Sequence, residues 1–533
     1  MSSKEKSGAG TSARSSSAAS SPVGAGSRGT PGSRTEARSR AAAAGTGQSF
    51  NVGLLGFGTV GSAFFELLEE RAGEIERFNG VRPVISGVLT RGRGSFEEIL
   101  AASDLLVELM GGIEPAREYL LRAMHAGKDV VSANKQLLSQ HGEELFETAR
   151  EHDVRLRFEA AVAGAVPVVR LLEESLSATP IERVHGIVNG TTNFILTEMA
   201  QGSSYDEALA EAQLRGFAEA DPEDDVSGRD AAAKMAILAR LAFGSPVSLE
   251  EVRYEGIEHL HAHDLEYARE LGLGLKLVGT AERYRGGLSV HVHPTFLYSG
   301  HPLASVSGPF NAVTVESEII TELTLSGPGA GGRQTASAVL GDVVSVMTGG
   351  ARPPAPPLAL ELVEDVESAY YLHLDVADRS GVLAAVTKVL GEHEVSIKSV
   401  VQRGLGERAR LVMVTHPVLE SRLRAALRRL EEFDFMRSEP RTIRVIEEEF
   451  TCGHTRADDP HSRAPERALS RAPAVRRFRS AGEPAGGLDP AAARAGPVRV
   501  GGGERAPEAG GRKPDRILQG PRDDVRGLGR RAG

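Results

Sequence analysis

The acidic stretch at residues 216–238, GFAEADPEDDVSGRDAAAKMAIL, contains the residues best suited to chemistry. Its carboxylates lie in a segment broken by Gly and Pro, which leads into an Ala-rich segment with one lysine. Asp230 and Lys234 are four residues apart, so they share one face of a helix. A lysine beside a carboxylate is suited to proton transfer, because burial and neighbouring charges tune the pKa of an amine. An ordinary surface ion pair explains this stretch alone equally well.

A second stretch, at residues 56–61, has the spacing of a dinucleotide-binding turn. GFGTVG follows a short apolar strand at 49–55 and precedes a helix, which is the context that the GxGxxG pattern requires. Gly56 permits the tight turn, Gly58 lets the backbone approach a pyrophosphate, and Gly61 lets the helix pack on the strand. The phosphates would then lie at the N-terminus of the helix.

The next strand, at residues 84–89, ends in the basic sequence TRGR. An acidic residue at this point is typical of NAD binding, because it accepts hydrogen bonds from the ribose 2′-hydroxyl. Arg91 instead favours a 2′-phosphate, and therefore NADP. The alternative is a solvated basic turn.

Strands and helices alternate as far as about residue 160. Buried strands are expected at 103–110 and 129–133, and the second delivers Lys135 at its carboxyl end, where ligands bind in open α/β sheets. The alternation predicts an α/β fold that begins with a doubly wound parallel sheet, a Rossmann-type domain.

From Glu159 the chain changes to a run of small residues, EAAVAGAVPVV. This carboxylate and the nearby bare carbonyls could hold a hard cation through oxygen ligands. Tight helix packing is the default interpretation of the same run.

The later part of the chain predicts two further domains. Strands and helices without strict alternation indicate an α+β substrate and dimerisation domain, in which a second glycine-rich loop at 327–332 opens the helix 334–347. After a proline hinge at 353–357, the strand and helix order βαββαβ over 371–447 is ferredoxin-like. The expected domains are a disordered tail at 1–47, a dinucleotide-binding domain at 48–160, a substrate domain at 161–350, a linker at 351–369, a ferredoxin-like domain at 370–448 and a disordered low-complexity tail at 449–533.

Composition excludes several classes of function. A length of 533 residues fits about three domains, and the single cysteine, Cys452, excludes a disulfide framework or a cysteine-based metal site. Residues 1–47 and 451–533 carry net charges of +5 and +7, which leaves −22 for residues 48–450. Such an acidic body argues against a nucleic-acid partner. No apolar run approaches the roughly 20 residues that a membrane helix needs, so we expect a soluble, cytoplasmic protein with no membrane partner.

Five motifs in this order closely resemble the homoserine dehydrogenase family: GFGTVG, SANK, NGTTN, GFAEADPEDDVSGRDAAAK and GPGAGG. The resemblance covers about residues 50–350. The unit at 371–447 resembles an ACT domain, a regulatory module that binds small amino acids. Because no aspartokinase-like domain precedes residue 50, the chain resembles the monofunctional form of the enzyme.

The resemblance implies NAD(P)-linked interconversion of L-aspartate 4-semialdehyde and L-homoserine, on the route to threonine and methionine. Lys234 would donate a proton to the substrate carbonyl, and Lys135 would position cofactor and substrate. Glu219 and Asp230 would bind the substrate through its ammonium group. NADP is the expected cofactor, with NAD possible, at Gly56, Phe57, Gly58, Thr59, Val60, Gly61, Arg91, Lys135, Gly216 and Gly331. A structural sodium ion would be bound by Glu159, Val162, Gly164 and Val166.

Two other functions compete with this one. An aldehyde-oxidising dehydrogenase such as aspartate-semialdehyde dehydrogenase needs a catalytic cysteine, and Cys452 lies at the edge of the low-complexity tail. An amino-acid sensor with an inert dehydrogenase body is disfavoured by the intact Lys135, Glu219, Asp230 and Lys234. We also expect a homo-oligomer, a dimer or tetramer, with threonine bound at a paired ACT interface near residues 378–382. The alternative is an ACT unit that only aids dimerisation.

Overall fold

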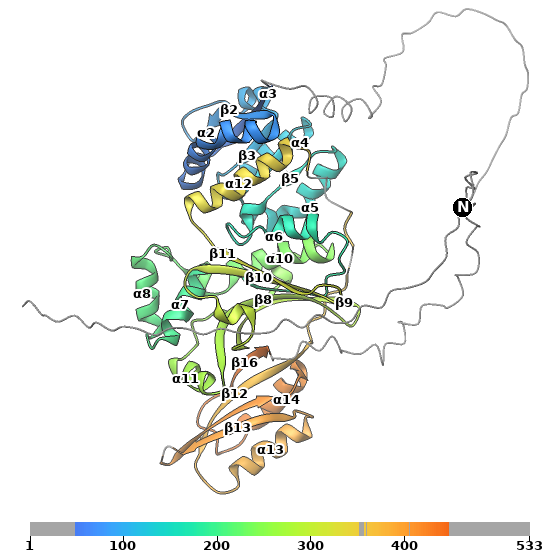
Figure 1. The fold of residues 1–533 in the computed structure, drawn as a ribbon. Helices are drawn as coiled ribbons and strands as arrows, with labels where there is room; N and C mark the ends of the chain where they lie inside the picture. Colours follow the sequence, from blue (N-terminus) through green and yellow to red (C-terminus); the bar gives the residue numbers. More distant parts are fainter. Residues whose placement is uncertain (1–47, 351–355, 359, 405, 447–533) are drawn as a thin grey trace, which may run out of the picture. The chain divides into compact units, whose positions relative to one another are not determined.

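The computed structural model describes residues 48–350, 356–358, 360–404 and 406–446 (Figure 1). The two expected tails lie outside the described residues, as does most of the expected proline hinge. In the part that is described, no helix has the length and apolar content needed to cross a membrane.

The first domain is built on a five-stranded sheet in the order β2-β1-β3-β4-β5, in which every pair is parallel. β3 and β4 are buried along their whole length, because helices cover both faces of a doubly wound sheet. This confirms the predicted Rossmann-type fold. The strands are β1 Gln48–Leu55, β2 Val81–Leu89, β3 Leu105–Glu108, β4 Asp129–Ser132 and β5 Leu156–Arg157, and the helices between them are α2 Thr59–Asn79, α3 Phe96–Ala102, α4 Ala116–His125 and α5 Lys135–Glu151.

A late helix, α12 (Gly332–Met347), completes this domain. Its buried residues Ala336, Val339 and Val343 follow helical spacing and pack in one core with Val52 and Leu68 of the first βα unit. The sequence alone placed this helix in the 161–350 segment. Helical periodicity shows which face of a helix is apolar but not which sheet will cover it, so this contact could not be predicted.

The second domain is an antiparallel sheet, β11-β10-β6-β8-β9, against which α7, α10 and α11 pack. α10 lies so close to β8 that a Cβ atom on Gly279 would be 2.3 Å from Met235. The small-residue run leads into a short α-helical turn, α6, which is followed by a π-helix, η2. The elements are β6 Arg183–Ile187, β7 Arg253–Tyr254, β8 Leu273–Tyr284, β9 Gly287–Tyr298, β10 Phe310–Ser317, β11 Thr321–Pro328, η1 Glu159–Ala161, α6 Val168–Arg170, η2 Leu171–Ser175, α7 Gly190–Ala200, α8 Tyr205–Leu214, α9 Glu223–Val226, α10 Arg229–Phe243, η3 Leu249–Glu251, α11 Ala262–Glu270 and η4 Pro302–Ser305.

The third domain has the strand order β16-β12-β14-β13 that is expected for a ferredoxin-like unit, which confirms the predicted βαββαβ arrangement. Its last strand also pairs with β9 in parallel, with Arg444 opposite Thr295, so the second and third domains share one continuous sheet. The elements are β12 Glu367–Ala377, α13 Val382–Glu392, β13 Ile397–Gly404, β14 Arg408–Thr415, β15 Val418–Leu419, α14 Glu420–Glu431 and β16 Arg441–Ile446.

Candidate active site

The three glycines of the first βα turn have different surroundings. Gly56 has a φ of +101°, and a Cβ atom there would lie 2.5 Å from the carbonyl oxygen of Leu109. A Cβ atom on Gly61 would lie 2.3 Å from the carbonyl oxygen of Gly56, whereas Gly58 faces open space at the N-terminus of α2. Open space at the uncapped start of a long helix suits a phosphate group, because the first backbone N–H groups point outward.

The second glycine-rich loop reaches this turn. Gly331, with a φ of +131°, precedes α12, and a Cβ atom on Gly332 would lie 3.2 Å from the methyl group of Thr59. Phe57, half-exposed, and Val60 complete the turn. The structure therefore brings together two loops that lie far apart in the sequence.

Arg91 lies in an exposed tight turn directly after β2. The turn is closed by a hydrogen bond from the Thr90 N–H to the Arg93 carbonyl, at 2.8 Å. The position beyond the end of β2 is where a Rossmann-type domain contacts the adenosine ribose.

Two lysines from different domains share one buried carboxylate. Asp230, in the first turn of α10, is 5% exposed and accepts a hydrogen bond from Lys135, the first residue of α5. Lys234, one turn further along α10, donates to the second oxygen of Asp230 and to the carbonyl of Val188, both at 2.7 Å. We call Asp230, Lys135 and Lys234 the lysine–carboxylate group.

The charges of this group stabilise one another. Burial alone would raise the pKa of Asp230, but Lys234 and Lys135 together hold this pKa below its ordinary value. For Lys135, burial lowers the pKa, yet the opposing field of Asp230 and of neighbouring carboxylates leaves it raised. The carboxylate is therefore ionised at neutral pH, and Lys135 is charged.

Asn189 fixes the orientation of Asp230, a role that the sequence analysis did not assign. Its side-chain N–H₂ donates to Asp230 at 2.8 Å and to Asp225 at 2.6 Å, while its Oδ1 accepts from the Thr192 N–H and caps α7. The signal in the sequence was the NGTTN motif at the end of a strand. The motif indicates a helix cap, but it does not show which carboxylate the cap will meet.

The other two expected ligands of the acidic stretch lie in an exposed loop. Gly216 has a φ of +74°, and Glu219 is exposed, with its backbone carbonyl accepting from Gln213 at 3.2 Å. The loop is tied to α7 by a hydrogen bond from Thr191 to the Phe217 carbonyl, at 2.7 Å. Among the described residues, neither Glu219 nor Gly216 makes a direct hydrogen bond to the lysine–carboxylate group.

The expected cation ligands lie where the parallel sheet ends and α6 begins. The buried Glu159 carboxylate accepts from the backbone N–H groups of Val169 and Arg170, each at 2.9 Å. Burial and the nearby Asp342 raise the pKa of Glu159 to about 7. No group of three His, Cys, Asp or Glu side chains suited to a metal ion occurs in the described ranges. The remaining expected ligands, all buried, are Val162, Gly164 and Val166.

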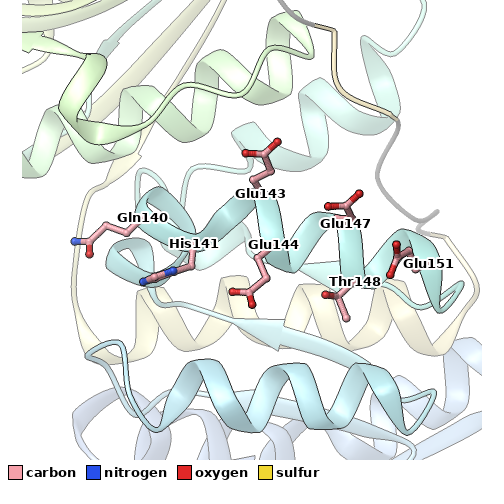
Figure 2. Close-up of a pocket in the computed structure, with 7 residues that line it drawn as sticks. All are labelled: Gln140, His141, Glu143, Glu144, Glu147, Thr148 and Glu151. Carbon is pink, nitrogen blue, oxygen red and sulfur yellow. The ribbon is translucent and has the colours of Figure 1, made fainter. Parts of the chain in front are cut away.

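A shallow hollow along α5 is separate from the lysine–carboxylate group. Figure 2 shows carboxylates along this helix, one of which, Glu144, pairs with Arg117 at 2.6 Å. Exposed acidic side chains along one helix face are ordinary solvated surface, so we assign no function to this hollow. It is lined by Gln140, His141, Glu143, Glu144, Glu147, Thr148 and Glu151.

A second hollow lies at the end of β12 in the ferredoxin-like domain. It is lined by residues 376–383 together with Gln402 and Leu411, so it contains the expected effector segment 378–382. Gly381, with a φ of +90°, opens α13 there and has no neighbouring atom where a Cβ would be.

Comparison with known families gives matches along most of the described chain. Residues 56–159 match "Homoserine dehydrogenase, NAD binding domain", residues 167–344 match "Homoserine dehydrogenase", and residues 370–435 match "ACT domain". The homoserine dehydrogenase of Corynebacterium glutamicum is 43% identical over 407 residues, which are 71% of this chain and 92% of the relative.

Solved structures agree with these matches. A homoserine dehydrogenase from Thiobacillus denitrificans is similar with a TM-score of 0.72 and 37% identity, covering 75% of this chain and 99% of that one. A hyperthermophilic archaeal homoserine dehydrogenase in complex with NADPH gives a TM-score of 0.50 and 28% identity, covering 57% of this chain and 100% of that one. The chain therefore belongs to the homoserine dehydrogenase family, NAD(P)-linked oxidoreductases that act on a CH–OH group, as its motifs predict.

Proposed function

We propose that this chain reduces L-aspartate 4-semialdehyde to L-homoserine, on the route to threonine and methionine, with the lysine–carboxylate group as the catalytic centre. The observation that carries the proposal is the sharing of one buried carboxylate by Lys135 and Lys234. Burying a carboxylate is costly, so a buried carboxylate that pairs with two lysines is typical of a functional site.

Lys234 is the proposed proton donor to the carbonyl oxygen of the substrate. A lysine ammonium has three N–H groups, and the bonds to Asp230 and Val188 occupy two of them. In the described part of the chain no group accepts from the third, which can donate to an oxygen on which negative charge develops during reduction. Because two bonds hold the amine, its position is fixed before the substrate arrives.

Lys135, Asp230 and Glu219 are proposed to position the substrate. Asp230 accepts from Lys135, Lys234 and Asn189, which leaves room for one further donor such as the substrate ammonium. Glu219 would supply the second carboxylate to this ammonium from the loop tied to α7. Charge-assisted bonds of this kind select an amino-acid substrate over a simple aldehyde.

The cofactor is proposed to be NADP, bound at Gly56, Phe57, Gly58, Thr59, Val60, Gly61, Arg91, Lys135, Gly216 and Gly331. The open space at Gly58 and the start of α2 fit a pyrophosphate, and the nicotinamide ring supplies the hydride when the cofactor is bound. The exposed guanidinium of Arg91 fits a 2′-phosphate, and one structural relative was solved with NADPH.

The test of the cofactor proposal is substrate-dependent oxidation of NADPH and NADH by wild type and by Arg91→Ala. We expect the variant to raise the KM for NADPH about tenfold, from the loss of roughly 1.4 kcal/mol, with the KM for NADH unchanged. Equal effects on the two cofactors would show that Arg91 does not read the 2′-phosphate. A wild-type enzyme inactive with both would contradict the proposed reaction.

We also propose a structural sodium ion at Glu159 and the backbone carbonyls of Val162, Gly164 and Val166. Support comes from the buried Glu159 carboxylate beside Asp342, where a cation would offset the repulsion that raises its pKa. Sodium chloride should therefore raise the melting temperature at pH 8 more than choline chloride does. The difference between the two salts should be absent in Glu159→Gln. An equal difference in wild type and variant would show that Glu159 does not bind sodium.

The ACT domain is proposed to bind threonine at residues 378–382 in a homo-oligomer, and thereby to inhibit turnover. The hollow at the start of α13 supports an amino-acid ligand, since it exposes backbone N–H groups at a helix start. Threonine at saturation should lower the rate and raise the melting temperature. If it changes neither, the ACT unit only aids assembly.

A further inference from the structure

Lys276, in β8, is a buried lysine that the proposed reaction does not use. It is 6% exposed, and among the described residues no carboxylate pairs with it. Its Nζ donates instead to two neutral oxygens, Oδ1 of Asn193 at 3.0 Å and the Val306 carbonyl at 2.5 Å. Burying an ammonium group in this way is costly, and burial lowers the pKa of Lys276 to about 8.

The partners of Lys276 hold the 306–310 loop, which leads into β10. The side-chain N–H₂ of Asn193 donates to the carbonyls of Val306, Gly308 and Phe310, at 3.3, 3.0 and 3.1 Å. The Gly308 N–H donates to the hydroxyl of Thr197 at 3.1 Å. The loop is therefore fixed by β8 and by two residues of α7.

The loop in turn contacts the residues that hold the lysine–carboxylate group. A Cβ atom on Gly190 would lie 2.7 Å from the Pro309 carbonyl, so the loop backbone packs directly on the start of α7. Asn311, which follows the loop, donates to the Val188 carbonyl at 3.3 Å, and the same carbonyl accepts from Lys234. Asn189, which orients Asp230, lies between these two contacts.

We propose that Lys276 is a positioning residue for the reaction. Together with Asn193 it anchors the 306–310 loop, and the loop sets the turn at 188–190 that aims Lys234 and Asp230. The proposal rests on the proton-donor role proposed for Lys234. A displacement of about 1 Å at a reacting group costs up to roughly 10²-fold in rate, so an anchor at this distance has a measurable effect.

The test compares Lys276→Met with Lys128→Met in the full chain. Lys128 also donates to a carbonyl, that of Ser103 at 2.7 Å, but it lies in the first domain. We expect Lys276→Met to lower kcat per folded site by about 10- to 100-fold, with the KM for NADPH within about twofold of wild type. The kinetic isotope effect with NADPH deuterated at C4 should rise, because the chemical step becomes more limiting. Lys128→Met should change none of these.

A second variant covers the case in which Lys276→Met does not fold. Thr197→Val keeps the side-chain shape but removes the hydroxyl that holds Gly308, and it should give the same lower kcat and larger isotope effect. A kcat within about twofold of wild type and an unchanged isotope effect, in whichever of the two variants folds, would overturn the proposal. Full activity of Lys234→Ala is a separate failure, because it would remove the proposed donor and not the anchor.

Discussion

The dinucleotide turn and the lysine–carboxylate group are assembled in opposite ways. The turn uses six consecutive residues, in which a Cβ atom at Gly56 or Gly61 would collide with a backbone carbonyl while Gly58 faces open space. The lysine–carboxylate group uses charged side chains from α5 and α10, oriented by the cap of α7. The first is sensitive to added atoms and the second to lost charge.

The largest effect is expected for Asp230→Asn. The variant keeps the shape but removes the negative charge that Lys135 and Lys234 share. The two ammonium groups would then repel each other, and kcat should fall by roughly 10² to 10⁴. Steady-state kinetics and circular dichroism together measure this loss in folded protein.

The matched control is Asp224→Asn in the same acidic stretch. Asp224 is exposed and pairs with Arg229 at 3.1 Å, a surface contact worth at most about 1 kcal/mol. We expect kcat within about twofold of wild type. Equal losses in the two variants would mean that the overall charge of the stretch matters, and not the contact with the lysines.

The next largest effect is a difference in stability between alanine variants of Gly61 and Gly58. Gly61→Ala places a Cβ atom 2.3 Å from a carbonyl oxygen, so it should destabilise the first domain by about 1–3 kcal/mol and weaken NADPH binding. Gly58→Ala meets no atom within 4 Å, so it should leave the melting temperature unchanged and weaken NADPH binding alone. Thermal unfolding and fluorescence titration with NADPH measure both. Normal affinity in Gly58→Ala would place the cofactor elsewhere.

The strand–turn–helix form of the first βα unit could be predicted from the sequence, because the glycine spacing and the flanking apolar strand and helix are local. The same holds for the pairing of Asp230 with Lys234, which are one helical turn apart. The contact between Lys135 and Asp230, 95 residues apart, and the cap from Asn189 depend on how α5, α7 and α10 pack. That packing is decided by side-chain shape across three elements, which periodicity does not encode.

The parallel pairing of β16 with β9 and the packing of α12 on the first domain could not be predicted from the sequence, for a related reason. The sequence predicts correctly that each is a strand or a helix. Several other elements could cover the apolar face of the helix or pair with the edge of the strand. α12 is separated from the strands it covers by the whole second domain. Element type is therefore a property of the local sequence, whereas the partner of an element is a property of the fold.

The smallest effect is a pH dependence of stability from Glu159. Its pKa is raised from 4.5 to about 7 in the folded protein. The contribution of Glu159 to the free energy of unfolding is therefore fully present below pH 4.5 and is lost as pH rises through 7. Between pH 5.5 and pH 8 the wild type should lose about 2 kcal/mol of unfolding free energy that Glu159→Gln does not lose. Urea unfolding at both pH values, in buffer without sodium, measures this difference. Glu147→Gln, at an exposed position of α5, should behave as wild type.

The most direct test of the central claim is chemical rescue of Lys234→Ala. The variant should lose at least about 10² in kcat while it retains its fold and its affinity for NADPH. A small alkylammonium ion can enter the space left by the side chain, so added ethylamine should restore turnover in proportion to its concentration. The same amine should have no effect on Asp230→Asn. A Lys234→Ala enzyme with normal kcat and no response to amine would contradict the assignment of Lys234 as proton donor.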